Sequence, residues 1–130
     1  MKQVALDTNA YSALQKGNSV VAEAVKSAVD VGIPITVLGE IYYGVFDGNN
    51  TSENTKNLQK FLGVDRVTVL NSDEKTAALF GEITAELKKI GKPIQQNDIW
   101  IAALCKQHNY TLVSNDQGFA NIIGLNLLTY

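Results

Sequence analysis

The sequence predicts a single α/β domain, with a mainly parallel five-stranded sheet flanked by helices. Five short apolar runs, most of them rich in β-branched residues, lie beside Asn, Asp, Gly or Ser, as strands of a buried sheet do. They occupy residues 4–6, 34–37, 66–69, 110–113 and 125–128. Helical patterns lie between them, and this alternation favours parallel pairing. A length of 130 residues is typical of one domain, so we expect one unit over 1–130.

The helical patterns are of two kinds. Apolar residues recur at spacings of three and four over 21–28, 58–62 and 80–90, which predicts amphipathic helices with one face on the core. A further helix is expected over 38–46. The run 99–105 is apolar on every side and predicts a helix in the centre of the domain. Residues 47–50 and 91–93 are typical of loops.

Charge and composition narrow the possible functions. The net charge of −2 gives no basic field to attract nucleic acid, although bound divalent cations would reverse the sign locally. No apolar run reaches the ~20 residues of a membrane span and no signal segment is visible, so we expect a cytoplasmic protein without a membrane partner. One cysteine, Cys105, and one histidine, His108, cannot form a zinc site. We expect a buried structural thiol and a solvated helix-end histidine.

Four acidic residues stand where strands end or helices begin. Asp7 follows the first predicted strand, Asp116 comes shortly after the fourth, and Glu40 lies a little beyond the second. Asp98 begins the buried helix, where the helix dipole favours an anion. Because the carboxyl ends of parallel strands share one edge of a sheet, we expect these acids to lie together.

Each acid also has an ordinary structural interpretation. Asp7 and Asp116 could be turn or N-cap residues, and either Asn97 or Asp98 could cap the buried helix. Glu40 could be a first-turn residue, although its neighbours predict apolar surroundings in which a lone carboxylate is costly. Converging carboxylates need a cation, and oxygen ligands suit Mg²⁺ or Mn²⁺. Such a site can activate water to hydrolyse a phosphodiester without a histidine.

Several short motifs carry a resemblance to a known family. They are Leu-Asp-Thr-Asn at 6–9, Gly-Glu-Ile-Tyr-Tyr-Gly at 39–44, Asn-Asp-Ile-Trp-Ile-Ala-Ala at 97–103 and Val-Ser-Asn-Asp at 113–116 with Phe119. In this order, and in a chain of this length, the sequence resembles the PIN-domain nucleases, in particular the VapC toxins of bacterial and archaeal toxin–antitoxin pairs. The resemblance implies metal-binding roles for Asp7, Glu40, Asp98 and Asp116, and a supporting polar role for Thr8 or Ser114.

The resemblance also implies partners. It implies a homodimer, an antitoxin whose tail covers the active-site groove, and cleavage of structured RNA such as tRNA or ribosomal RNA. Apolar side chains could contact these partners or could pack in the core: Tyr11, Leu14, Ile41, Tyr42 and Phe46. Lys88, Lys89 and Lys92 could meet RNA phosphates or form a solvated helix end.

Other functions fit the sequence less well. A receiver-type phosphotransfer domain would have adjacent acids after the first strand, where this chain has Asp7-Thr8. A dehalogenase-like phosphatase would have a second acid at the position of Asn9. A PIN nuclease that processes RNA without being a toxin stays open. A non-catalytic RNA-binding or interaction module also stays open, although it would have no need of acids at four strand and helix ends.

Overall fold

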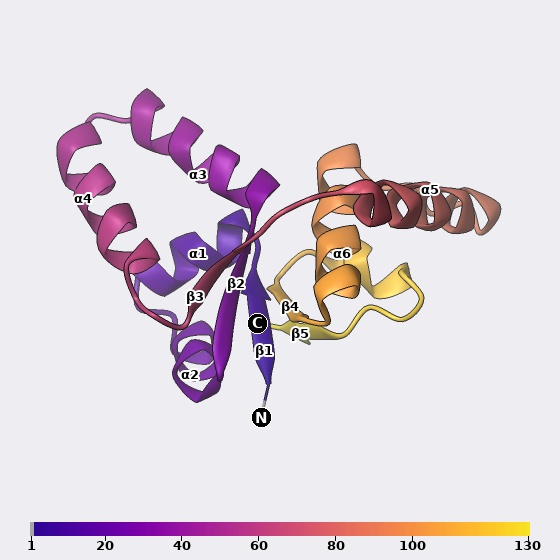
Figure 1. Cartoon of the computed structure of the whole chain (residues 1–130), viewed down its shortest axis with the longest axis horizontal. Coiled ribbons are helices and arrows are strands. Elements are labelled where there is room, and N and C mark those ends of the chain that lie inside the picture. Colours follow the sequence, from indigo (N-terminus) through magenta and orange to yellow (C-terminus); the bar gives the residue numbers. More distant parts are fainter. Residues whose placement is uncertain (1) are drawn as a thin grey trace.

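Five parallel strands form one sheet at the centre of the molecule. The computed structural model describes residues 2–130. The strands are β1 (Gln3–Leu6), β2 (Asp30–Pro34), β3 (Val67–Leu70), β4 (Thr111–Ser114) and β5 (Leu127–Thr129). They lie in the order β3-β2-β1-β4-β5, and every adjacent pair is parallel (Figure 1). The predicted α/β class and parallel sheet are confirmed.

Six α-helices surround the sheet. They are α1 (Thr8–Gln15), α2 (Ser19–Ser27), α3 (Ile35–Asp47), α4 (Thr51–Leu62), α5 (Glu74–Lys89) and α6 (Gln96–His108), and a short 3₁₀ helix, η1 (Gln117–Asn121), follows β4. Figure 1 shows α1 and α2 on one side of the sheet, α5 and α6 on the other, and α3 and α4 extending outward as a helical pair. None of the helices within residues 2–130 has the length and apolar character needed to cross a membrane.

One predicted strand was misplaced, and one helix was not predicted. The second strand is not at 34–37 but at β2, and Pro34 is the N-cap of α3. Proline lacks the backbone N–H that helix starts leave unpaired, so it suits this position despite the β-branched residues that follow. Gly32 in the middle of β2 weakens the strand pattern there. The short helix α1 was not predicted, because only Ala10 and Tyr11 are buried on it.

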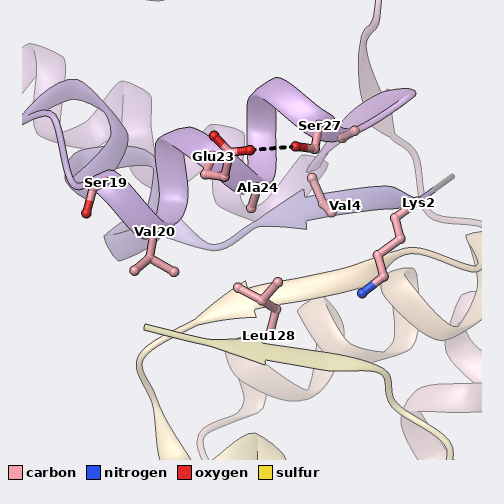
Figure 2. A pocket seen from close by; sticks show the side chains of 9 residues that line it. Lys2, Val4, Ser19, Val20, Glu23, Ala24, Ser27 and Leu128 are labelled. Atoms are coloured by element: carbon pink, nitrogen blue, oxygen red, sulfur yellow. Dashed lines mark hydrogen bonds between the residues drawn. The ribbon is translucent and has the colours of Figure 1, made fainter.

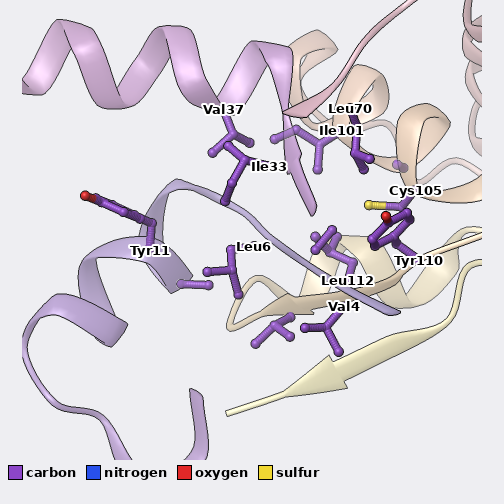
Figure 3. Packing of buried hydrophobic residues seen from close by; sticks show 14 of the residues in the cluster. Val4, Leu6, Tyr11, Ile33, Val37, Leu70, Ile101, Cys105, Tyr110 and Leu112 are labelled. Carbon is purple, nitrogen blue, oxygen red and sulfur yellow. The ribbon is translucent and has the colours of Figure 1, made fainter. Parts of the chain in front are cut away.

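The core is made by the sheet and by α6. Buried side chains of β1, β2 and β4 pack together with α6 residues from Ile99 to Cys105 (Figure 3). Burial raises the pKa of the Cys105 thiol, which agrees with the expected structural role. As predicted, the run from Ile99 to Cys105 is buried, apart from the half-buried Trp100.

One tight contact sets the packing of β2 against Leu70, in β3, and Tyr110, which directly precedes β4. A Cβ added to Gly32 would lie 2.9 Å from Leu70 Cδ1 and 3.0 Å from the Tyr110 ring. The ring cannot move easily, because the Tyr110 hydroxyl donates a 2.7 Å hydrogen bond to Asp30 Oδ1. The Thr68 hydroxyl holds the other oxygen of Asp30 at 3.0 Å. The absence of a side chain at residue 32 therefore allows the layers to approach.

We expect Gly32→Ala to lower the free energy of unfolding by about 1–3 kcal/mol, because the added methyl overpacks a buried site. Urea unfolding measures the change. Gly81→Ala is the matched control, since residue 81 is an exposed helical glycine with open space around its missing Cβ. That control should gain about 0.5–1 kcal/mol from helix propensity. Equal effects of the two variants would contradict the packing argument.

Candidate metal centre

All four predicted acids line one small hollow at the carboxyl edge of the sheet. The hollow has a volume of about 150 Å³. Its lining residues are Asp7, Thr8, Asn9, Glu40, Asp98, Ile101 and Asp116. They come from the segment that follows β1 and begins α1, from the segment that follows β4, and from the helices α3 and α6. Tertiary structure therefore gathers side chains from four separate parts of the chain.

A larger hollow lies elsewhere and has a different character. It measures about 670 Å³ and lies between α2, the start of β1 and β5 (Figure 2). Apolar side chains such as Val4, Val20 and Leu128 dominate it, with Lys2 and Glu23 among its lining. It offers a single carboxylate, and that carboxylate accepts a hydrogen bond from Ser27 at 3.1 Å. Size alone therefore does not mark the chemical site, and the acidic hollow is the stronger candidate.

Asp7 is both a helix cap and a member of the acidic cluster. Its Oδ1 accepts a 2.8 Å hydrogen bond from the Ala10 backbone N–H, so it caps α1 as the ordinary interpretation expected. Burial raises the pKa of the Asp7 carboxyl, and the charges of Asp116 and Glu40 raise it further. Hydrogen bonds from Ser114 and from Ala10 oppose this rise. An ionised carboxylate has about four acceptor sites, so these two hydrogen bonds leave room for another ligand.

Ser114 forms hydrogen bonds with two of the acidic residues, Asp7 and Asp116. Its side chain is fully buried, and its hydroxyl stabilises the ionised Asp7. The same oxygen accepts a 3.0 Å hydrogen bond from the Asp116 backbone N–H. Asp116 Oδ1 in turn accepts from the Gly118 N–H at 2.9 Å and caps η1. The chain after β4 is thus held in a turn that keeps Asp116 at the hollow.

Glu40 lies on the exposed side of α3. The predicted apolar surroundings were wrong, because the buried stripe of this helix is formed by Val37, Ile41 and Val45. Glu40 instead accepts two hydrogen bonds on its Oε1 atom. One comes from the Thr8 hydroxyl at 3.0 Å and the other from Asn97 Nδ2 at 2.6 Å.

Asp98 lies in the first turn of α6, and the charges of the other three acids all act on its carboxyl. The helix begins at Gln96 with Gln95 as its N-cap, so the prediction that Asn97 or Asp98 caps it was wrong. Burial raises the pKa of the Asp98 carboxyl, and the charges of Asp116, Asp7 and Glu40 add to the effect in that order. A shared cation would relieve this repulsion.

The donor set fits a hard divalent cation. Every titratable group in the hollow is a carboxylate, the ligand type preferred by Mg²⁺ and Mn²⁺. Within residues 2–130, no three His, Cys, Asp or Glu side chains are packed closely enough to form a complete ligand cluster. Water occupies about 30 Å³ per molecule, so the hollow has room for an ion that keeps several waters, as Mg²⁺ does.

Comparison with known proteins identifies the family of this chain. The PIN domain model matches residues 4–125. The chain belongs to the PIN-domain family. Ribonuclease VapC2 of Haemophilus influenzae is 34% identical over 128 residues, which cover 96% of each chain. The resemblance that the motifs indicated is confirmed.

Solved structures of VapBC complexes contain chains with a fold similar to that of this PIN domain. VapBC2 from Rickettsia felis, bound to a DNA fragment from its promoter, has a chain with a TM-score of 0.84 and 29% identity that covers 98% of both chains. A chain of VapBC-1 from nontypeable Haemophilus influenzae has a TM-score of 0.86 and 26% identity. The match covers 98% of this chain and 97% of that chain. Both matches cover essentially the whole PIN domain.

Sequence reasoning did not find the role of Asn97 at this PIN-domain site. The residue lies in the 97–103 motif, but it was considered only as a possible helix cap. Its contact with Glu40 joins residues 57 positions apart in the chain. Only the packing of α3 near α6 brings them together, so no local pattern could have revealed it.

We expect Asp98→Asn to keep or raise the stability of the metal-free PIN domain at pH 7. The folded-state pKa of Asp98 is raised, so ionisation opposes folding, and this cost is absent below the usual pKa of 3.8 and grows at higher pH. The stability difference between variant and wild type should therefore be larger at pH 7 than at pH 4. Urea unfolding in EDTA measures it at both values.

Glu53→Gln is the matched control for this measurement. Glu53 is likewise a first-turn acid, on α4, but it lies outside the acidic hollow. Removing its charge should lower stability by about 0.3–1 kcal/mol through the helix dipole alone. A marked loss of stability in Asp98→Asn at pH 7 would contradict the repulsion argument.

Proposed function

We propose that this chain is a Mg²⁺- or Mn²⁺-dependent endoribonuclease and the toxin of a VapBC-type toxin–antitoxin pair, acting as one nuclease domain over 1–130. The observation that carries the proposal is the convergence of four carboxylates on one hollow at the carboxyl edge of a parallel sheet. Membership in the PIN-domain family and similarity to a VapC ribonuclease support the reaction type.

The acids and their neighbours have different tasks in this proposal. Asp7, Glu40, Asp98 and Asp116 would hold the cation directly or through water molecules that it keeps, while Ser114 orients Asp7 and Thr8 orients Glu40. A bound divalent cation supplies positive charge for the phosphodiester and acidifies water for hydrolysis. Asp7 and Asp116 come from the loops that follow neighbouring strands, so the sheet keeps their spacing rigid. Rigid spacing suits a site that must align water with a phosphorus atom.

No histidine takes part in the proposed chemistry. The one histidine of the sequence, His108, lies at the far end of α6, with its Nε2 3.1 Å from the Asn71 carbonyl oxygen. The acidic hollow also explains how a protein of net charge −2 could bind RNA. Positive charge would come with the cation, at the position where the phosphate must sit.

The antitoxin would bind in a groove that continues from the acids. This groove of about 400 Å³ lies between α1, α3 and α4, and Thr8 and Glu40 line both it and the acidic hollow. Tyr11, Ile41 and Val45 give it an apolar floor. Phe46, also proposed as a contact, is 68% exposed on α3. An antitoxin tail with apolar anchors and one basic side chain would fill the groove and neutralise the carboxylates.

We also propose that the substrate is tRNA or ribosomal RNA, that the protein forms a homodimer, and that it is located in the cytoplasm.

Purified protein freed of antitoxin should cleave RNA with Mg²⁺ or Mn²⁺ and stop when EDTA is added. Asp116→Asn should lower kcat/KM by at least about 100-fold, or ~2.7 kcal/mol, because a neutral amide binds the cation weakly. Fluorescent reporter RNA and structured tRNA substrates measure the rates. Glu53→Gln is the control that should retain activity. Equal activity in EDTA would rule out the metal mechanism.

Expression of the wild-type protein alone should arrest growth, and Asp7→Asn should be harmless at the same protein level. The asparagine can still accept the α1 cap hydrogen bond, so the variant should fold while binding metal poorly. Growth curves with quantitative immunoblots compare the two. Co-expression of an adjacent antitoxin gene should restore growth and yield a stable complex. If both proteins slow growth equally, toxicity does not come from this site.

A further inference from the structure

Asn97 makes the shortest hydrogen bond to any of the four acids, with 2.6 Å between its Nδ2 and Glu40 Oε1. The Thr8 hydroxyl donates to the same oxygen at 3.0 Å. Two donors from two different elements, α1 and α6, therefore meet on one atom of a side chain of α3. The other oxygen of Glu40 receives no hydrogen bond from residues 2–130.

We infer that Asn97 is a positioning residue for the metal site, which with Thr8 fixes Glu40 so that its Oε2 atom is presented to the cation. This rests on the function proposed above. A glutamate on an exposed helix face has several rotamers of similar energy, and binding a ligand would have to order them. Hydrogen bonds from both sides order the side chain in advance. Outer partners of this kind orient the carboxylates that bind metals.

The type of donor matters as much as its position. A lysine or arginine at residue 97 would also bind Glu40, but its positive charge would compete with the cation. The amide of Asn97 orders the carboxylate and leaves its negative charge available. Asp98, the next residue of α6, lines the hollow, so one helix turn supplies both a carboxylate and an orienting amide.

The local structure of α6 supports a role beyond stability. Asparagine is a good N-cap residue and a poor residue inside a helix. In α6 the cap is Gln95, which makes no side-chain cap hydrogen bond, while Asn97 is the second residue of the helix. The helix thus begins without the cap that its own asparagine could have provided. Sequences depart from local stability rules most often at functional sites.

The test is Mn²⁺ binding by isothermal titration calorimetry on purified, antitoxin-free protein. Asn97→Ala should weaken binding by about 10- to 100-fold. Gln59→Ala is the matched control, because Gln59 Nε2 also donates to a side chain of α3, the Tyr42 hydroxyl at 3.0 Å, but away from Glu40. The control should leave Mn²⁺ affinity unchanged. Thermal unfolding in EDTA shows that both variants remain folded at the titration temperature.

A double-mutant cycle with Glu40→Ala shows whether Asn97 acts through Glu40. Once Glu40 is removed, Asn97→Ala should change Mn²⁺ affinity by less than about twofold, because residues that act as a unit are not additive. RNA cleavage gives a second measurement: saturating Mn²⁺ should restore most of kcat in Asn97→Ala, with KM for RNA unchanged.

Two results would overturn the inference while leaving the proposed function intact. One is an unchanged Mn²⁺ affinity in Asn97→Ala when Glu40→Ala weakens binding, which would make the hydrogen bond a tether between helices only. The other is an equal loss of Mn²⁺ affinity when Asn97→Ala is made in the wild-type protein and in Glu40→Ala. That result would mean that Asn97 does not act through Glu40. If Glu40→Ala itself leaves Mn²⁺ affinity unchanged, the metal site proposed above fails as well.

Discussion

The parallel pairing of β1 with β4 is the constraint on which the site depends. Ala5 pairs with Leu112 and Leu6 with Val113, so both strands end at the same level of the sheet. The chain runs from β1 outward in one direction to β2 and β3, and β4 and β5 lie on the other side. This reversal leaves a crevice beyond the strand ends, where open α/β sheets bind ligands. Asp7 and Asp116 flank it.

Electrostatic repulsion is the cost of placing the acids there, and the fold offsets it locally. Asp7 is stabilised by a helix N–H and by Ser114, Asp116 by the backbone of η1, and Glu40 by two neutral donors. Asp98 has the helix dipole, but it is repelled by all three of the other acids. For these acids, a role as a helix cap therefore does not exclude a role in binding a cation. The same carboxylate can end a helix with one oxygen and face a cation with the other.

Glu40 differs from Asp7 and Asp116 because both hydrogen bonds that it accepts come from side chains and neither comes from the backbone. The buried helix α6 fixes Asn97, and the cap of α1 fixes Thr8. Both therefore act from rigid elements on an exposed and otherwise mobile side chain. The groove beside Glu40 is also the proposed antitoxin surface. A partner that displaced these two donors would disturb the metal site without touching the other acids.

The sequence by itself determined the fold class, the buried α6 and the four acids, because short apolar strands, helical periodicity and strand-end motifs are local patterns. It misplaced β2, where Gly32 interrupts the strand pattern and Pro34 ends it, and it missed α1, which buries little. Tertiary structure alone decided that Glu40 is exposed and that Asn97 bonds to it, since that contact joins distant segments. The tertiary structure also brings the Ser114 hydroxyl into contact with Asp7. Such contacts depend on how helices pack across a sheet, which residue spacing along the chain does not encode.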